Sequence, residues 1–266
     1  MSPLTTIQQV DFSKSEQYTL SIRINTDGFS FSIFDPSAES PYLFFDLAID
    51  PSLPIIANFK NLVAHNPFLS QLYKRVNIIL VNTRTVVHPL DLFSPDIKER
   101  LYQFGQREVK TNSQIAYNIL EQKKLAVLFS INKTLYNFLN EHFRNPHFFA
   151  QSTPLLAYYA QKSKERNCKK LFAHIENGNI HLFAYNKGKL LLTNTFQAKE
   201  LSNQVYYILY VWKQINLSQQ EDELLLAGQV SSSDQLVEIL RKYIASVSIL
   251  QDQRYIDLKA INLCEL

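Results

Sequence analysis

Two short segments of this chain place a carboxylate beside a glycine, a combination that can bind magnesium and phosphate. The first is Thr26-Asp27-Gly28, followed by Ser30, and the second is Glu176-Asn177-Gly178. A carboxylate is a ligand for Mg²⁺, and a glycine lets backbone N–H groups approach an anion. A third glycine, Gly228, ends the apolar run LLLAG. The candidate cofactor-binding residues are therefore Asp27, Gly28, Ser30, Glu176, Gly178 and Gly228.

The glycine count argues against an intact nucleotide loop. The chain has only five glycines, and they are widely separated. Phosphate-binding loops need closely spaced glycines, so neither a P-loop nor a dinucleotide fingerprint can be written from this set. The simpler interpretation, which we favour, is that Gly28 and Gly178 supply the positive φ of hairpin turns. No serine lies in a Gly-x-Ser-x-Gly elbow, and we predict no catalytic residues.

A pair of histidines offers a second possible chemistry. A two-residue turn at Asn177-Gly178 places His174 directly opposite His181 and Ile175 opposite Ile180. Facing imidazoles can hold a metal ion, with Glu176 as a third ligand. Nothing else converges on them in the sequence. We therefore favour hydrogen-bonded histidines on a partly covered sheet face, and we predict no metal site.

The elements that carry these residues occur in two similar runs. Each run has a strand, a turn with glycine, a second strand, a turn, a third strand, a helix and an apolar strand. In the first run, an Asp27-Gly28 turn would place Ile24 opposite Phe31, with one polar face open to water or a partner. In the second run, the turns are Asn177-Gly178 and Lys187-Gly188. A final strand is expected at Tyr255 to Ile261.

The fold class predicted from this order is α/β, with two ribonuclease-H-like units. Each unit would be a mixed sheet with helices on both faces. The polar stretch 106–113 is the best boundary, which gives a first domain at 1–112 and a second at 113–266. The helix between Lys199 and Asn216 is apolar on nearly all sides. We favour a helix that is covered on both sides, and the alternative is a Tyr-rich surface for a partner.

Composition narrows the class of protein. The 266 residues are 46% hydrophobic and 19% charged, so the chain can bury a large core. A net charge of +3 gives no argument for nucleic acid. The start has no basic region followed by an apolar run, and no apolar stretch is long enough to span a bilayer. Two distant cysteines favour reduced thiols. We expect a cytoplasmic protein without membrane insertion.

The duplicated order resembles the actin-like ATPase superfamily, and most closely the cytoplasmic actin-like proteins of type IV pilus assembly and type II secretion. The chain is identified as a degenerate member from an uncharacterised bacterial family. The resemblance implies an Asp-x-Gly phosphate loop in each half, but Asp27 is adjacent to Gly28, and Glu176 replaces the second aspartate. It also implies paired glycines for adenosine, where this chain has only Gly228 after Ala227.

Three functions are compatible with the sequence. The first, which we favour, is a non-enzymatic pseudo-ATPase that binds a protein partner or a second copy, with no cofactor. The second is a nucleotide-binding ATPase or kinase that uses ATP and Mg²⁺ in an interdomain cleft. The third, a nuclease of the ribonuclease-H type, needs clustered carboxylates, whereas Asp27 and Asp35 would lie at opposite ends of their hairpin.

Overall fold

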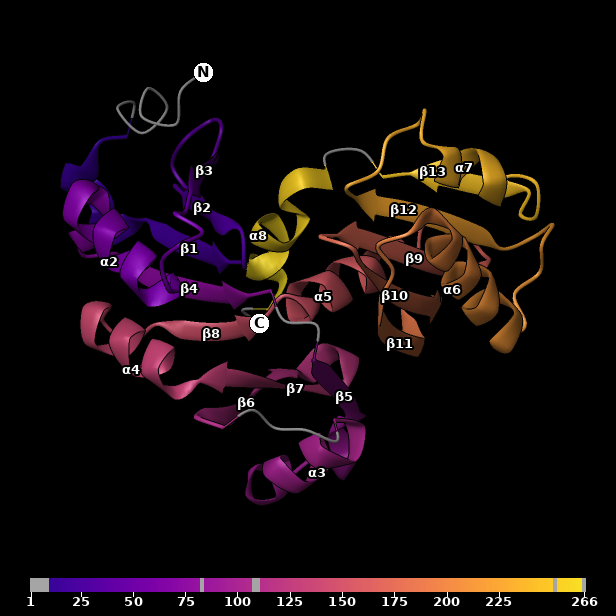
Figure 1. Cartoon of the computed structure of the whole chain (residues 1–266), viewed down its shortest axis with the longest axis horizontal. Helices are drawn as coiled ribbons and strands as arrows, with labels where there is room; N and C mark the ends of the chain where they lie inside the picture. Colours follow the sequence, from indigo (N-terminus) through magenta and orange to yellow (C-terminus); the bar gives the residue numbers. More distant parts are fainter. Residues whose placement is uncertain (1–9, 82–83, 107–110, 251–252, 265–266) are drawn as a thin grey trace. The chain divides into compact units, whose positions relative to one another are not determined.

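The computed structural model describes residues 10–81, 84–106, 111–250 and 253–264, which form two compact units (Figure 1). Unit 1 contains Met1–Pro154 together with Asp257–Ile261. Unit 2 contains Leu155–Ile256 and Asn262–Leu266. Among the described residues, no helix is long and apolar enough to cross a membrane.

Unit 1 is built around a five-stranded mixed sheet in the order β3-β2-β1-β4-β8. β1, β2 and β3 are antiparallel neighbours, whereas β4 and β8 run parallel to β1. Helix α2 covers one face, where Phe59 packs edge-on against Phe29 at 5.2 Å between ring centroids. The strands and helices of this part are β1 (Thr19–Ile24), β2 (Gly28–Phe34), β3 (Tyr42–Ala48), α2 (Ile55–His65), β4 (Arg75–Leu80), α4 (Lys133–His142) and β8 (His147–Ala150).

The first hairpin has a different register from the predicted one. Ile24 pairs with Phe29, not with Phe31, and Thr26-Asp27 is the turn. The Asn25 side chain explains the change, because its Oδ1 accepts the Thr26 N–H at 2.7 Å. The Asn25 N–H donates to the Gly28 carbonyl at 3.0 Å, which brings Gly28 into the strand. A shift of two residues keeps every side chain on its predicted face.

A second, three-stranded sheet in unit 1 has the order β5-β7-β6. Tyr102 of α3 packs there with Ile115, Ala126 and Leu128 in a small core. β7 pairs with β5, so strands from both sides of residue 112 share one sheet. The compact units divide after Pro154. The domain boundary at residue 112 stays a prediction, and part of the stretch 106–113 lies outside the described residues. The elements are β5 (Thr85–Pro89), α3 (Lys98–Gly105), β6 (Ser113–Leu120) and β7 (Leu125–Asn132).

Unit 2 repeats the same strand order, β11-β10-β9-β12-β13. Helices α6 and α7 pack on one face through Ile208, Trp212 and Val237. α5 packs on the other, where Tyr159 stacks on Phe172 at 4.5 Å. The elements are α5 (Ser152–Lys162), β9 (Lys169–Glu176), β10 (Asn179–Asn186), β11 (Lys189–Gln197), α6 (Leu201–Gln214), β12 (Glu223–Gly228), α7 (Gln235–Leu240) and β13 (Ser246–Ile249). The predicted duplication of a mixed sheet is confirmed.

The segment from Tyr255 to Ile261 is helical, so the predicted final strand is wrong. It forms α8 (Ile256–Ala260), with short 3₁₀ turns on either side. The alternating apolar residues suggested a strand, but Asp257 between them is also buried. Its carboxylate lies 3.3 Å from Arg23 Nη1 and accepts a hydrogen bond from Gln151 Nε2 at 2.9 Å. α8 therefore covers the polar face of the first hairpin, which was expected to face water or a partner.

Short 3₁₀ helices complete the described chain. They are η1 (Phe12–Gln17), η2 (Pro67–Ser70), η3 (Leu90–Leu92), η4 (Pro95–Ile97), η5 (Glu121–Lys123), η6 (Gln253–Tyr255) and η7 (Ile261–Cys264).

We expect Asp257→Ala to destabilise unit 1 by about 3 kcal/mol, because it removes a buried carboxylate that pairs with the largely buried charge of Arg23. The exposed ion pair of Lys14 with Asp11 supplies the control, and Lys14→Ala should cost less than about 1 kcal/mol. Urea denaturation followed by far-ultraviolet circular dichroism measures the free energy of unfolding of both variants. Equal losses in the two variants would contradict the assigned role of Asp257.

Candidate functional site

The turn between β9 and β10 is the best-defined part of the candidate site. Asn177 and Gly178 have φ of 51° and 70°, as required for a two-residue type I′ hairpin turn. The register pairs Ile175 with Ile180 and His174 with His181, which confirms the predicted turn. In unit 1, by contrast, Gly28 is not among the glycines with positive φ. The interpretation of a left-handed glycine is therefore right for Gly178 and wrong for Gly28.

Gln229 closes this turn from the neighbouring strand. The Asn177 N–H donates to Gln229 Oε1 at 2.9 Å, and Gln229 Nε2 donates to Asn177 Oδ1 at 3.0 Å. The Gln229 N–H donates to the Ile175 carbonyl at 2.6 Å. Nothing in the sequence indicates this partner, because Gln229 follows β12 and is distant from Asn177 along the chain.

Gly228 has a packing reason for being glycine. Its φ is 85°, and it pairs with Ile175 across β9 and β12. A Cβ at this position would overlap the carbonyl oxygen of Ile175. Glu176, Gly178 and Gly228 are therefore brought close together in unit 2. Their geometry follows from strand pairing and the turn, without a ligand.

The remaining candidates lie in unit 1. Asp27 is exposed in the hairpin turn, where its Oδ1 accepts the Thr26 hydroxyl at 3.2 Å. Ser30 is buried on β2, in register with Arg23 on one side and Asp46 on the other. The six candidates thus form one group in each unit, and a role for them in nucleotide binding stays a prediction.

The two histidines belong to a buried hydrogen-bonded network. His174 Nδ1 lies 3.1 Å from the Tyr159 hydroxyl, and His181 Nδ1 lies 3.0 Å from Thr195 Oγ1. Glu176 lies beside His174, with 3.6 Å between Oε2 and Nε2. The hydrogen bonds expected of structural histidines are therefore present. Within the described part of the chain, no group of three or more His, Cys, Asp or Glu side chains could hold a metal ion.

Burial decides the protonation state of His181. Its side chain is almost fully enclosed, and the nearby His174 adds a repulsion when both are charged. Together these effects lower the pKa of His181 to about 4, while Glu176 acts in the opposite direction. His181 is therefore neutral at pH 7, which suits a structural residue and removes it as an acid catalyst.

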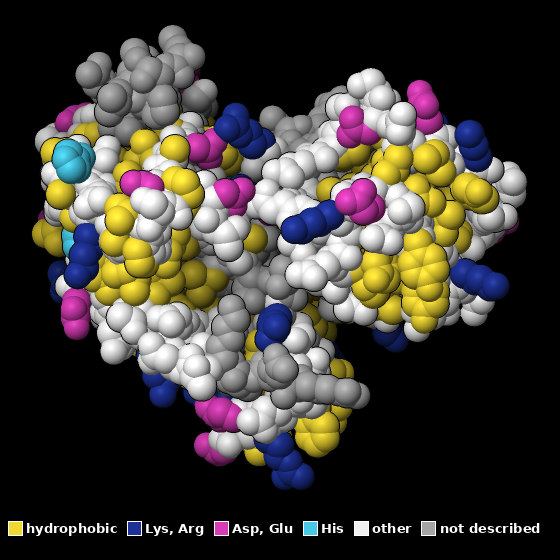
Figure 2. Space-filling view, in the orientation of Figure 1, with side chains coloured by type: hydrophobic (Ala, Val, Ile, Leu, Met, Phe, Trp, Pro, Cys, Tyr) yellow, Lys and Arg dark blue, Asp and Glu magenta, His cyan; other side chains and the backbone are white. Residues whose placement is uncertain are grey.

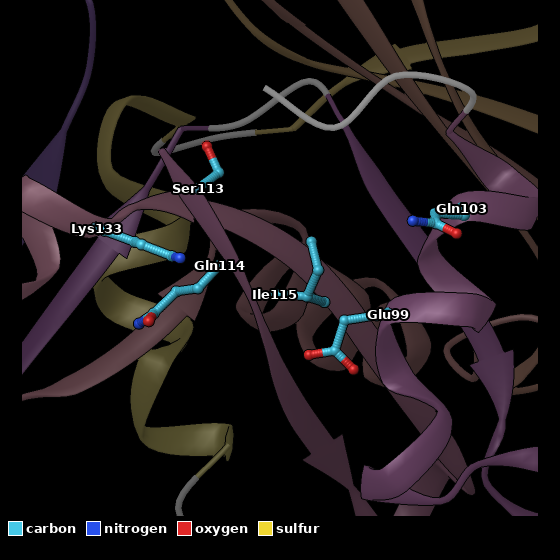
Figure 3. A pocket seen from close by; sticks show the side chains of 6 residues that line it. All are labelled: Glu99, Gln103, Ser113, Gln114, Ile115 and Lys133. Carbon is cyan, nitrogen blue, oxygen red and sulfur yellow. The ribbon is translucent and has the colours of Figure 1, made fainter. Parts of the chain in front are cut away.

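A small cavity of about 240 Å³ lies at the three-stranded sheet of unit 1. In Figure 3, Glu99 and Gln103 come from α3 on one side of β6, whereas Gln114 and Lys133 lie on its other side. The polar groups do not converge on one point. No nucleophile and general base are paired there, so this cavity does not suggest catalysis.

The strand order and the duplication define an actin-like ATPase fold, and a solved structure agrees closely. It is a Bacteroides thetaiotaomicron protein described as having an actin-like ATPase fold and unknown function, 40% identical to this chain. The match covers 95% of this chain and 98% of that one, with a TM-score of 0.90. Residues 7–247 match the model of the protein family of unknown function DUF3822, and this chain belongs to that family.

A more distant structure extends the similarity of fold. The type IV pilus biogenesis complex of PilM and PilN has a chain that is 11% identical, with a TM-score of 0.55. The match covers 91% of this chain and 89% of that chain. No curated protein sequence matches this chain.

The His181 environment predicts a loss of stability in acid. Because the folded pKa is below the ordinary value of 6.5, the unfolded state binds the proton more tightly. The contribution of His181 to the free energy of unfolding is therefore constant above pH 6.5. It falls by up to about 3 kcal/mol as the pH decreases from 6.5 to 4.

The control for this prediction is His181→Gln, which stays polar but does not titrate. Urea unfolding of both proteins at several pH values between 4 and 7 isolates the contribution of this side chain. The wild type should have the steeper pH dependence. Parallel curves would show that His181 is not the responsible group.

Proposed function

We propose that this protein is a non-enzymatic, actin-like pseudo-ATPase that acts as an interaction or scaffold module. The observation that supports this proposal is the hydrogen bond from the Asn177 N–H to Gln229 Oε1. Phosphate binding at a tight turn depends on backbone N–H groups that point at the anion. Here the Gln229 side chain takes the position that a phosphate oxygen would need at this N–H.

The glycines support the same proposal. Gly178 provides the left-handed turn, and Gly228 avoids a clash with Ile175. Both are accounted for by the fold, so neither requires a nucleotide to explain it. The alternative of an ATPase or kinase would require Gln229 to leave the turn and release Asn177. That movement breaks both side-chain hydrogen bonds between these residues before any phosphate could bind.

A surface suited to a protein partner lies on α6. Tyr206 and Tyr210 are 59% and 49% exposed, and their rings stack on each other at 5.8 Å. The expectation that this helix is covered on both sides is therefore wrong for these two residues. Tyr207 stacks on Phe196 of β11 at 4.3 Å, which continues the aromatic surface to the edge strand of the sheet.

The exposure of these side chains favours recognition. Figure 2 shows hydrophobic side chains gathered on the face of unit 2 where α6 lies in Figure 1. Tyrosine is enriched at protein interfaces, because it buries a large rigid ring and keeps a polar hydroxyl. The PilM structure of similar fold is a complex with a protein, PilN. We infer that α6 and β11 are where this chain binds a protein partner.

We expect Mg-ATP to leave the melting temperature of this protein unchanged within about 1 °C. A nucleotide at 100 times its Kd would instead add about 2.7 kcal/mol of stability, which raises the melting temperature by several degrees. Differential scanning fluorimetry of the wild type and of Asp27→Ala makes the comparison. A clear increase in the wild type that is lost in Asp27→Ala would contradict the proposal.

We expect Tyr206→Ser combined with Tyr210→Ser to weaken partner binding at least tenfold, or about 1.4 kcal/mol. Affinity purification from the native cell, followed by titration of the identified partner, measures the change. Sedimentation of the purified protein reports any binding to a second copy. Tyr243→Ser is the control, because Tyr243 is also 49% exposed but lies outside α6 and β11. Unchanged binding in the double variant would exclude this surface.

A further inference from the structure

A basic cavity of about 460 Å³ lies in unit 1, at the amino ends of β4 and β8. β4 and β8 run parallel to β1, whereas the turn with Asp27 follows the carboxyl end of β1. The cavity is therefore at the opposite end of this sheet from the candidate residues Asp27 and Gly28. Its polar lining includes Glu16, Lys74, Arg75, Arg144, Asn145 and His147.

Strand pairing brings these side chains together from separate parts of the chain. Asn77 of β4 pairs with His147 of β8, so the residues preceding the two strands are neighbours. The Lys74 N–H donates to the Tyr18 carbonyl at 3.0 Å, which ties the entry to β4 against η1 and β1. Asn145 has a φ of 48°, and this left-handed residue turns the chain from α4 into β8. The positions are thus set by backbone contacts.

The charges of the cavity are unbalanced. Lys74, Arg75 and Arg144 carry positive charges, and Glu16 is the one carboxylate among the described residues of the lining. Among the described residues, neither Lys74 nor Arg144 has a carboxylate oxygen within 4.0 Å. Arg75 is held in place because its Nε donates to Asn77 Oδ1 at 2.8 Å. Three cations that line one cavity create a positive potential that attracts an anion.

We propose that this cavity binds the phosphate group of a small phosphomonoester. Arginine offers a planar fork of N–H donors that matches phosphate oxygens, and lysine adds a point charge. Several cations attract a doubly charged phosphate group more strongly than they attract a singly charged carboxylate group. The volume lies within the range of small-molecule pockets, so there is room for an organic group beside the phosphate. The proposal does not depend on the pseudo-ATPase function, which concerns other residues.

Isothermal titration with glycerol 3-phosphate and with inorganic phosphate tests this proposal at constant ionic strength in NaCl. We expect glycerol 3-phosphate to bind the wild type. Lys74→Ala combined with Arg144→Ala should weaken that binding at least tenfold. The control removes two exposed cations from unit 2, Lys213→Ala with Arg241→Ala, and so changes the net charge equally. Its affinity should stay within twofold of the wild type.

Three results would overturn the proposal. The first is the absence of binding by either phosphate compound, and the second is an equal loss of affinity in both double variants. The third is binding of citrate that is as tight as that of glycerol 3-phosphate, which would assign the cavity to carboxylates. Lys74 and Arg144 are exposed, so the variant should keep the wild-type melting temperature and loss of binding can be distinguished from unfolding.

Discussion

The close approach of two backbones at Ile175 determines the geometry of the candidate site. The Ile175 carbonyl accepts the Gln229 N–H, and the same oxygen leaves no room for a side chain at position 228. Since Gly228 ends β12 in a left-handed conformation, the chain turns there and presents Gln229 to the β9–β10 turn. One steric constraint therefore fixes the end of a strand, the identity of a glycine and the partner of Asn177.

The sequence predicts the local part of this arrangement and not the long-range part. Asn177-Gly178 is a strong turn signal because both residues adopt positive φ easily, so the register of the second hairpin follows directly. The predicted register of the first hairpin is wrong because the Asn25 side chain accepts the Thr26 N–H. This hydrogen bond places the turn at Thr26-Asp27, against the general preference of Asp-Gly for the turn position. Gln229 could not be identified, since its contact depends on the parallel pairing of β9 with β12.

The duplicated sheets were predictable, whereas the helical nature of α8 was not. The strands of the two antiparallel hairpins and their succession along the chain follow from alternating apolar residues and turn residues, which are local patterns. In the segment from Tyr255 to Ile261, the same alternation occurs in a helix. A buried ion pair between Asp257 and Arg23 and the packing of Lys259 over Phe44 stabilise it on unit 1. A contact between positions so distant leaves no sign in a short window of sequence.

The place of α8 in unit 1 has a consequence for how the chain folds during synthesis. Arg23 and Asp257 are separated by 234 positions, so the ribosome makes residues Leu155–Ile256 of unit 2 before it adds Asp257, the buried carboxylate that pairs with Arg23. Until then, Arg23 and the serines around it have no helix over them. Unit 2 can complete its own sheet earlier, because β9 to β13 are continuous in the sequence. The polar face of the first hairpin is therefore covered by α8 only after all the strands of unit 2 have been made.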